Sequence, residues 1–384
     1  MKKRVLMVAT VPSMIGQFNM NNIKMLQELG YKVDVAGDFM DVSVWPAERV
    51  QKYKEQLNKM DIEAIQLDFS RSPLKVGRHM ASYKAILNLI KNRNYAFIHT
   101  HTPIASAIVR QAAHNTGTRV IYTAHGFHFY NGAPLKNWII FYPIEKHFSR
   151  FTDILITINK EDFRRANKRF KAKQTVYIPG VGVNIEKYAV CKIDRSVKRA
   201  ELGVKDSDFV LLSVGELSER KNQKIVIEAL HKMKESGTID NIVYLAVGRG
   251  DKEEVFRQSI QEYDLQDHVK LLGFRSDIDE LCETVDCFVH PSIREGLGIA
   301  PLEAMAAGLP LISASINGIR DYTEDGVSGC CINPRKVNEL IKAIMKMRDD
   351  KGFRTLCAHN NLETVKAFDQ SKTNSIMKRI YSSM

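Results

Sequence analysis

The sequence has no run of 18 uninterrupted apolar residues, and we therefore expect no membrane-spanning helix. Its six cysteines show no metal-type spacing, and scattered thiols of this kind are typical of a reducing cytosol. The pairs Gly180/Gly182 and Gly248/Gly250 are only fragments of a dinucleotide fingerprint, and no G-x-x-x-x-G-K-[ST] phosphate loop is present. No internal repeat of solenoid length is visible. These absences argue against a membrane span, a cysteine-based metal site, a P-loop and a repeat protein.

Acidic side chains are scarce in the first half of the chain. The formal net charge is +12, but residues 1–183 carry 27 Lys/Arg and 13 Asp/Glu, whereas residues 184–384 carry 29 and 31. Residues 69–183 alone hold 18 basic and 4 acidic groups. This asymmetry indicates that one half meets an anionic surface or polymer: nucleic acid, an acidic polysaccharide and anionic lipid headgroups all fit. A basic face that merely aids solubility is the other interpretation.

The length and composition are those of a globular protein. The chain has 384 residues, of which 44% are hydrophobic and 26% charged, and this length suggests about two domains. Its start, MKKRVLMVATVPSM, combines basic residues with a short apolar run, but Pro12 and a polar stretch follow without a small-residue cleavage site. We therefore expect a first β-strand here and not a signal peptide.

Short β-branched runs alternate with amphipathic stretches along the whole chain. Strands are predicted at Val5–Ala9, Lys32–Ala36, Ala64–Leu67, Ala96–Thr100, Arg119–Thr123, Asp153–Thr157, Thr175–Ile178, Phe209–Val214, Ile242–Val247, His268–Leu272, Cys287–Val289 and Leu309–Ser313. Helices are predicted at Asn22–Leu29, Ser82–Lys91, Ile104–Ala113, Asn222–Lys234, Asp251–Glu262, Ala300–Ala307, Lys336–Met347 and Ser371–Ser383. This alternation predicts an α/β fold of parallel, doubly wound sheets, and continuous apolar strands suit sheets covered on both faces.

The weakly periodic, charged segment Asn184–Glu201 indicates a domain junction. We expect a first domain over 1–183, a linker over 184–200 and a second domain over 201–368. A C-terminal helix over 369–384 is expected to pack back on the first domain. Two such domains in tandem would face a central cleft, with ligands bound beyond the carboxyl ends of the strands.

The sharpest motif is His290-Pro-Ser-Ile-Arg-Glu-Gly-Leu-Gly-Ile-Ala-Pro-Leu-Glu-Ala-Met-Ala-Ala-Gly308, a strand end, a glycine-bearing loop and a helix start. Glu295 lies in the loop and Glu303 on the helix. Two carboxylates beside backbone N–H groups at a helix N-terminus can hold a polyhydroxy ligand that carries phosphate. A helix cap at Glu295 and a surface charge at Glu303 are the alternative.

In this context the motif resembles the Glu-x7-Glu donor site of the family 4 retaining glycosyltransferases, which have the GT-B fold. The match extends through nearly all 384 residues. Val214–Asn222 resembles the family's loop after the first strand of the second domain, and Leu272–Asp277 resembles its base-binding turn. Tyr122–Gly132 resembles the first-domain catalytic loop of bacterial exopolysaccharide and capsule members.

The resemblance implies a donor site and its roles. Glu303 would accept from the ribose hydroxyls, Glu295 would contact the donor sugar, and Lys221 would hold the diphosphate and stabilise its departure. With His125, Lys221 and Glu295 as catalytic residues, the donor-binding set comprises Gly16, Gly215, Arg220, Lys221, Phe274, Glu295, Gly296, Gly298, Ile299 and Glu303. The family usually has Arg where this chain has Glu216, which leaves Arg220 as the candidate substitute. Gly16 stands alone in a predicted loop, Thr10–Asn22, where the family often has a glycine pair.

Two further signals have competing interpretations. In the family, the histidine matching His125 contacts the transferred sugar, whereas an isolated sequence would favour a structural histidine. His99 and His101 face one way on a strand, and with His125 and His128 they raise a metal site as an alternative. Asp277-Ile278-Asp279 has the D-x-D form of metal-dependent enzymes of another fold, but its position before a helix favours capping. We expect no metal and no cofactor.

These observations predict a metal-independent, retaining glycosyltransferase that moves a hexose or N-acetylhexosamine from a UDP-sugar to a lipid-linked or oligosaccharide acceptor in bacterial surface or exopolysaccharide synthesis. The nearly neutral second domain would bind the donor, and the basic first domain would bind the acceptor and an anionic membrane from the cytoplasmic side. No nucleic-acid partner is expected. A GT-B UDP-sugar epimerase or phosphorylase is one alternative, and a non-catalytic binder of nucleic acid or another anionic polymer is a more distant one.

Overall fold

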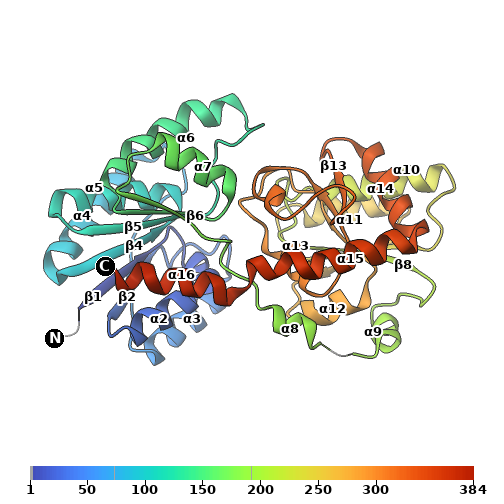
Figure 1. Ribbon diagram of the computed structural model, residues 1–384, viewed down its shortest axis with the longest axis horizontal. Helices are drawn as coiled ribbons and strands as arrows, with labels where there is room; N and C mark the ends of the chain where they lie inside the picture. The colour runs from blue at the N-terminus through green and yellow to red at the C-terminus, as the bar shows by residue number, and fades with distance from the viewer. Residues whose placement is uncertain (1–2, 73, 192) are drawn as a thin grey trace. The chain divides into compact units, whose positions relative to one another are not determined.

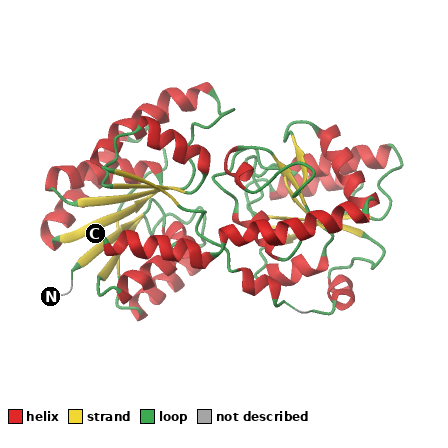
Figure 2. Cartoon of the chain, viewed as in Figure 1, coloured by secondary structure: helices red, strands yellow, loops and turns green. Residues whose placement is uncertain are grey.

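The chain folds into two compact units. A computed structural model describes residues 3–72, 74–191 and 193–384. Unit 1 comprises Met1–Val181 and Ser371–Met384, and unit 2 comprises Gly182–Gln370. Each unit is a parallel sheet with helices on both faces (Figure 2). The two doubly wound sheets predicted from the sequence are therefore confirmed.

Unit 1 has a seven-stranded parallel sheet with the order β3-β2-β1-β4-β5-β6-β7. Its strands are β1 Arg4–Val8, β2 Lys32–Gly37, β3 Glu63–Gln66, β4 Tyr95–His101, β5 Arg119–Ala124, β6 Ile154–Thr157 and β7 Gln174–Tyr177. Its helices are α1 Pro12–Phe18, α2 Met20–Glu28, α3 Ala47–Lys59, α4 Val76–Arg93, α5 Pro103–Thr116, α6 Leu135–Phe148, α7 Lys160–Arg169 and α16 Gln370–Ser382, with the 3₁₀ turn η1 Ser149–Phe151.

Unit 2 has a six-stranded parallel sheet with the order β10-β9-β8-β11-β12-β13. Its strands are β8 Phe209–Val214, β9 Ile242–Val247, β10 Val269–Gly273, β11 Cys287–His290, β12 Leu311–Ala314 and β13 Gly329–Ile332. Its helices are α8 Ile185–Ala189, α9 Arg195–Glu201, α10 Lys224–Glu235, α11 Glu253–Glu262, α12 Ile278–Thr284, α13 Ile299–Ala306, α14 Val337–Asp349 and α15 Lys351–Val365, with the 3₁₀ turns η2 Asn317–Asp321 and η3 Lys366–Phe368.

The cores explain why the strands read as continuous apolar runs. Every residue of β9 is buried, as are all but the last of β8, because helices cover both faces of the sheet. In both sheets the chain starts in the middle, moves to one edge and then returns to the other side of the first strand. The direction of winding reverses between β1 and β4 in unit 1 and between β8 and β11 in unit 2. Ligands of such sheets bind beyond the carboxyl ends of these strands.

The chain passes between the units twice, and the two crossings adjoin each other. Val183 N donates to Phe368 O at 3.0 Å, and Gln370 N donates to Val183 O at 3.0 Å. A Cβ on Gly182 would lie 2.5 Å from Cα of Gln370, so the two segments touch where the chain enters and leaves unit 2.

The segment 184–200, assigned to a linker from its composition, contains α8 and the start of α9. Both helices belong to unit 2, where α8 packs on α13 and α9 packs on α12. Lys192 in this segment lies outside the described residues. The C-terminal helix α16, red in Figure 1, follows the second crossing and belongs to unit 1. It packs on the sheet of unit 1 through Tyr381, whose ring stacks on Phe97 of β4.

Candidate active site

In unit 2 the loops after β8 and β11 meet at the reversal of the sheet. Ile293 N donates to Arg220 O at 3.0 Å, and the Asn222 amide donates to Pro291 O at 3.0 Å and to Pro334 O at 2.8 Å. Asn222 has a φ of +59°, a left-handed conformation that asparagine tolerates better than most residues. These bonds hold the two predicted donor-binding loops together.

Glu295 is the centre of a charged cluster. Its carboxylate lies 2.6 Å from Nζ of Lys221, 3.4 Å from the Arg220 guanidinium and 3.5 Å from Nε2 of His290. The side chains of Glu295 and Lys221 are only 12% and 14% exposed, so water screens the ion pair weakly. Ser292 Oγ adds a contact of 3.4 Å to the same carboxylate oxygen. The structure thus brings Lys221, Arg220 and Glu295 together, as the sequence motif predicts.

The protonation states follow from this arrangement. Burial alone would raise the pKa of Glu295, but Lys221, His290 and Arg220 outweigh burial and hold that pKa well below its usual value. Burial lowers the pKa of His290, although contact with Glu295 opposes the shift. At neutral pH the cluster therefore contains an ionised carboxylate, two cations and a neutral imidazole.

The cluster lies at the N-terminus of α13. Gly298 is the residue before this helix and has a φ of +81°, while Ile299 is its first residue and Gly298 supplies no side-chain cap. A Cβ on Gly298 would lie 3.1 Å from Glu295 Cγ, 3.2 Å from the Tyr322 hydroxyl and 3.3 Å from His290 Nε2. Glycine therefore lets the helix start, with its N–H groups and positive dipole end, approach the charged cluster.

Gly296 lies earlier in the same loop and packs against η2. A Cβ placed on Gly318 would be 1.9 Å from Gly296 O, so the two backbones are in direct contact. The Tyr322 hydroxyl, which follows η2, donates to Leu297 O at 2.8 Å. The loop that carries Glu295 is thereby held by η2 and by Tyr322.

Glu303 projects from α13 and meets Tyr188 of α8. The Tyr188 hydroxyl forms a hydrogen bond with the Glu303 carboxylate. Burial raises the pKa of Glu303, while this hydrogen bond and the charge of Lys187 act in the opposite direction. A half-buried carboxylate with one hydroxyl donor retains lone pairs that can accept from ligand hydroxyls.

Glycines also bring the loops after β8 and β9 together. Gly215 has a φ of +153°, and a Cβ there would lie 3.3 Å from Cε of Lys221. A Cβ on Gly248 would lie 1.9 Å from Gly215 O, and one on Gly250 would lie 2.1 Å from Leu217 O. The incomplete fingerprint Gly248/Gly250 thus has a packing role here. Phe274, after β10, keeps a 61% exposed side chain.

Gly16 has a different environment from the one predicted. The expected loop Thr10–Asn22 is largely helical, because Pro12 occupies the first turn of α1 and Gly16 lies inside that helix. A Cβ on Gly16 would lie 2.4 Å from the Trp45 ring and 3.1 Å from the Tyr53 ring. The expectation of a glycine-bearing loop is therefore wrong, and the contacts seen at Gly16 are helix packing.

In unit 1 three histidines form a row across β4 and β5, in which His99 and His101 are buried and His125 is half-buried. His125 follows β5, and its Nε2 lies 3.1 Å from Nδ1 of His101, whose own Nε2 is buried with no partner in the described part of the chain. The His99 ring bonds to Thr123 and to the Tyr381 hydroxyl of α16, each at 2.8 Å. Burial lowers the pKa of His99 to about 3 and that of His125 to about 4, and it holds the pKa of His101 well below normal. All three rings are neutral at physiological pH.

The loop after His125 is anchored by α7. Phe127 N donates to the buried Asp162 carboxylate at 2.9 Å, and Asn131 N donates to Glu161 at 2.7 Å. Burial raises the pKa of Asp162 to about 6. His128 of this loop stacks on Phe141 instead of joining the histidine row. Within the described ranges, no group of three or more His, Cys, Asp and Glu side chains could hold a metal ion.

The D-x-D sequence does not cap α12 as predicted. Asp277 is the residue before the helix, but its side chain makes no capping hydrogen bond. It pairs instead with Arg275 and with Lys198 Nζ, the latter at 2.8 Å, and Asp279 pairs with Lys187 at 3.1 Å. These ion pairs, above all the one with Arg275, hold the pKa of Asp277 far below its usual value against the effect of burial. Cations from α8 and α9 compete for both carboxylates, which the local sequence does not reveal.

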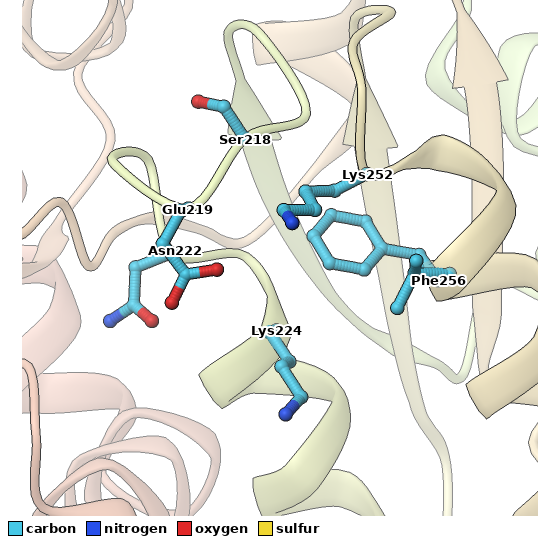
Figure 3. Close-up of a pocket in the computed structure, with 7 residues that line it drawn as sticks. Ser218, Glu219, Asn222, Lys224, Lys252 and Phe256 are labelled. Atoms are coloured by element: carbon cyan, nitrogen blue, oxygen red, sulfur yellow. The ribbon is translucent and has the colours of Figure 1, made fainter.

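A pocket next to the Lys221 loop is lined by other residues. Figure 3 shows Glu219 and Asn222 on one wall and Lys252 and Phe256 on the other, between the loop after β8 and the start of α11. None of the predicted donor residues lines this pocket. We therefore place the candidate site at the charged cluster, where the chemistry is, and not at the pocket.

The structure also shows site residues that the sequence did not single out. His290 and Ser292 belong to the quoted motif, and their position at a strand end could have marked them. Tyr188 and Tyr322 contact the site from distant segments, and no local pattern points to them. In the part of the chain that the structure describes, no helix is long and apolar enough to cross a membrane.

Comparisons with known proteins identify the family of the chain. The family model described as "Glycosyltransferase Family 4" matches residues 15–187, and that described as "Glycosyl transferases group 1" matches residues 194–364. The putative glycosyltransferase EpsD of Bacillus subtilis (strain 168) is 34% identical over 387 residues, which cover 100% of this chain and 97% of that protein.

Two further matches are a named transferase and a solved structure. An Escherichia coli protein, UDP-Gal:alpha-D-GlcNAc-diphosphoundecaprenol alpha-1,3-galactosyltransferase, is 28% identical over 310 residues, covering 80% of each chain. The crystal structure of Anabaena Alr3699/HepE in complex with UDP and glucose superposes with a TM-score of 0.78 over 100% of both chains at 22% identity, which shows a shared GT-B fold. The B. subtilis and E. coli relatives favour transfer over the epimerase alternative. The chain belongs to the family 4, group 1 glycosyltransferases, and it is a glycosyltransferase.

Proposed function

We propose that this glycosyltransferase moves a hexose or N-acetylhexosamine from a UDP-sugar to a lipid-linked glycan, with retention of configuration, in bacterial surface or exopolysaccharide synthesis. The E. coli relative is named for a UDP-sugar donor and a diphosphoundecaprenol acceptor, and the Anabaena structure contains UDP and glucose. Both facts concern those proteins, and they support the same substrate classes here.

The observation that carries the proposal is the Lys221–Glu295 pair at the start of α13. A diphosphate that approaches the helix N-terminus would meet the Lys221 ammonium, the Arg220 guanidinium and the N–H groups that follow Gly298. Arg220 would then supply the second cation that Glu216 cannot provide. Glu295 is ionised and already oriented by Lys221, and it would accept hydrogen bonds from the donor sugar.

The other predicted residues fit the nucleoside part of the donor. Glu303 would accept from the ribose hydroxyls, with Tyr188 holding its carboxylate in place. The exposed ring of Phe274, at the carboxyl end of β10, would contact the base, and Gly215 would allow the backbone to approach the donor. Gly16 contributes in this proposal only through the packing of α1.

In the proposed reaction, the bond between the anomeric carbon and the phosphate oxygen breaks, and a bond from the acceptor hydroxyl to that carbon forms on the same face. The hydroxyl proton goes to the leaving diphosphate. Lys221 and the α13 amides would neutralise the growing negative charge without a metal ion, which is the main catalytic contribution of the protein. The neutral His125 would hydrogen-bond the transferred sugar.

The basic unit 1 would bind the acceptor and an anionic membrane surface, where each Lys or Arg near the surface contributes about 1 kcal/mol.

The experiment that tests the proposed function measures UDP release from a panel of UDP-sugars with a glycolipid acceptor, for the wild type and for Lys221→Ala, Glu303→Gln and His125→Ala. We expect at least a tenfold loss of kcat/KM in each, because each removes a group that contacts the donor.

Lys234→Ala is the matched control, since Lys234 also pairs with a carboxylate in unit 2, at 2.5 Å from Asp264, away from this cluster. We expect this variant to keep wild-type turnover. Unchanged turnover in both Lys221→Ala and Glu303→Gln would reject the donor site, and release of an epimerised UDP-sugar without acceptor would reject transfer.

A further inference from the structure

Helix α6 of unit 1 turns an apolar face to solvent. Leu135, Ile139, Ile140 and Ile144 are 74%, 66%, 45% and 39% exposed, and they follow one another along successive turns of this one helix. We call these four side chains the α6 apolar face. An exposed cluster of large aliphatic side chains on one helix indicates an interaction surface.

The opposite side of α6 is already packed. Glu145 is buried, and Trp138, Phe141 and Tyr142 contact the aromatic core under the helix. The fold of unit 1 therefore does not need the α6 apolar face. The exposed residues Lys136 and Lys146 lie near its two ends, so the face has a cation at each end of the helix.

The electrostatic setting selects the partner. Glu145 is the sole acidic residue between positions 69 and 152, and it is buried against Arg110 at 2.8 Å. Of the three acidic residues between positions 153 and 183, Asp153 pairs with Lys173 and both Glu161 and Asp162 face Arg165. Arg71, Arg78 and Arg93 of the same stretch pair with carboxylates from the first 68 residues. Lys136 and Lys146 on α6 itself are exposed, and aliphatic residues flanked by lysines suit a membrane interface with anionic headgroups.

We propose that the α6 apolar face inserts into the headgroup region of an anionic lipid bilayer, with Lys136 and Lys146 at the phosphate level. The helix would lie in the plane of the interface, with its aliphatic side chains about 5–10 Å deep. A second copy of this chain could also cover aliphatic residues, but identical faces with a lysine at each end would repel each other. Charge complementarity therefore favours lipid.

The place of α6 in the chain connects this surface to the proposed function, on which the biological meaning of the inference rests. The loop from His125 leads directly into α6, and Asn137 in the first turn of the helix donates to His128 O at 3.0 Å. A helix held at the bilayer would keep this loop near the surface where the sugar end of a lipid-linked acceptor lies.

The experiment is co-sedimentation of the full chain with vesicles of phosphatidylcholine alone and of phosphatidylcholine mixed with phosphatidylglycerol. We expect binding to the mixed vesicles only. The double variant Ile139→Ser/Ile140→Ser should lower the partition coefficient about tenfold or more, because two aliphatic side chains no longer enter the interface. Val190→Ser/Val197→Ser is the matched control, since it removes two exposed valines of unit 2 (69% and 65% exposed), and it should bind like the wild type.

Tryptophan fluorescence locates the contact. The chain has two tryptophans, and Trp45 is buried in unit 1 while Trp138 lies on α6. Because Trp138 packs on the core side of the helix, the reporter is placed on the α6 apolar face by Ile140→Trp in a Trp45→Phe/Trp138→Phe background. Mixed vesicles should shift the emission of this variant to the blue, and brominated lipids should quench it. Equal vesicle binding by wild type and the Ile139/Ile140 variant would overturn the inference, as would a concentration-dependent dimer that the variant abolishes without any vesicle binding.

Activity separates this inference from the proposed function. With a water-soluble acceptor the Ile139/Ile140 variant should turn over like the wild type, and with an acceptor embedded in mixed vesicles it should be several-fold slower. If the wild type transfers sugar from no UDP-sugar, the proposed function fails while the vesicle result still decides the membrane contact. Equal rates of wild type and variant on embedded acceptor, with normal vesicle binding by both, would refute the inference alone.

Discussion

At the scale of single residues, the candidate site depends on competition for one carboxylate. Glu295 neutralises Lys221 and Arg220, and the same two cations are those that a diphosphate would need. The ion pair keeps Lys221 in place without a ligand, so little side-chain entropy is lost when an anion arrives. The two cations in turn keep Glu295 ionised, and once a diphosphate binds them, the carboxylate is available to accept hydrogen bonds from sugar hydroxyls. A buried pair of this kind contributes more to organisation than to net stability.

Gly298 allows a direct test of this organisation. Gly298→Ala places a Cβ within 3.1–3.3 Å of Glu295, Tyr322 and His290 at a φ of +81°. We expect a loss of about 1–2 kcal/mol from the left-handed backbone and a further, larger loss of UDP affinity. Gly326→Ala is the control, because Gly326 has a φ of +80° and no atom within 4 Å of its Cβ position.

Thermal unfolding and UDP titration of the two variants measure both effects. Similar losses of stability, with UDP binding impaired in Gly298→Ala alone, are the expected result. If Gly326→Ala weakened UDP binding as much, the close approach at Gly298 would have no special role.

The sequence indicates the residues of this site better than it indicates how they are held. Lys221, Glu295 and Glu303 belong to recognisable motifs, because ligand contacts restrict residue types at fixed spacings. Tyr188 lies on a short helix in a segment with weak periodicity, and nothing local shows that its hydroxyl reaches Glu303. Gly16 was misplaced because a lone glycine near a strand end suggests a loop, whereas its partner Trp45 is distant in sequence.

At the scale of elements, the two sheets were predictable because buried parallel strands are uninterrupted apolar runs. The strands β8 and β9 match the predicted ranges to the residue. Strand β13 was missed, since its centre is Cys330-Cys331 and carries no β-branched signal. The strand predicted from Leu309 begins at Leu311, because Leu309 N instead closes α13 through Ala304 O at 2.9 Å. Helix α6 was missed because it is apolar on both sides and contains Pro143.

The histidine row of β4 and β5 predicts acid sensitivity. Burial depresses the pKa values of His99, His101 and His125, so these rings stay neutral in the folded chain while they take up protons in the unfolded chain below about pH 6.5. The unfolded state then binds more protons, and stability falls as the pH drops from about 6.5 towards the folded pKa values. Each such group contributes a slope of about 1.4 kcal/mol per pH unit in this window.

The corresponding variant is His101→Gln, which keeps a polar side chain beside His125 and removes one titrating group. Its unfolding free energy should be lower at pH 7 but should fall less steeply between pH 7 and 5 than that of the wild type. A His101→Gln profile parallel to the wild type would contradict the assignment.

At the scale of the whole molecule, charge and binding chemistry are divided between the units. The excess of positive charge lies in the first half of the sequence, while the nearly neutral second half holds the Lys221–Glu295 cluster. Each unit also has its own core, that of unit 2 including buried residues from β8, α10 and α14. A unit with its own core can fold independently.

We therefore expect the isolated fragment 182–370 to fold. It should unfold cooperatively on heating, and UDP should raise its Tm by an amount that grows with the logarithm of the UDP concentration above Kd, because the nucleotide binds only the folded form. Circular dichroism and thermal scans of the fragment, with Lys221→Ala in the same fragment as control, measure this. A disordered spectrum would show that unit 2 requires unit 1, and equal UDP protection of the control would move the nucleotide site away from Lys221.

The adjoining crossings at Gly182 and Gln370 make unit 2 an insertion within unit 1, entered and left at one point. Unit 2 can therefore be exchanged as a whole. Substituting the corresponding piece of a relative at these two cut points would leave both chain ends and the histidine row untouched, and the hybrid should inherit its sugar nucleotide preference from the graft.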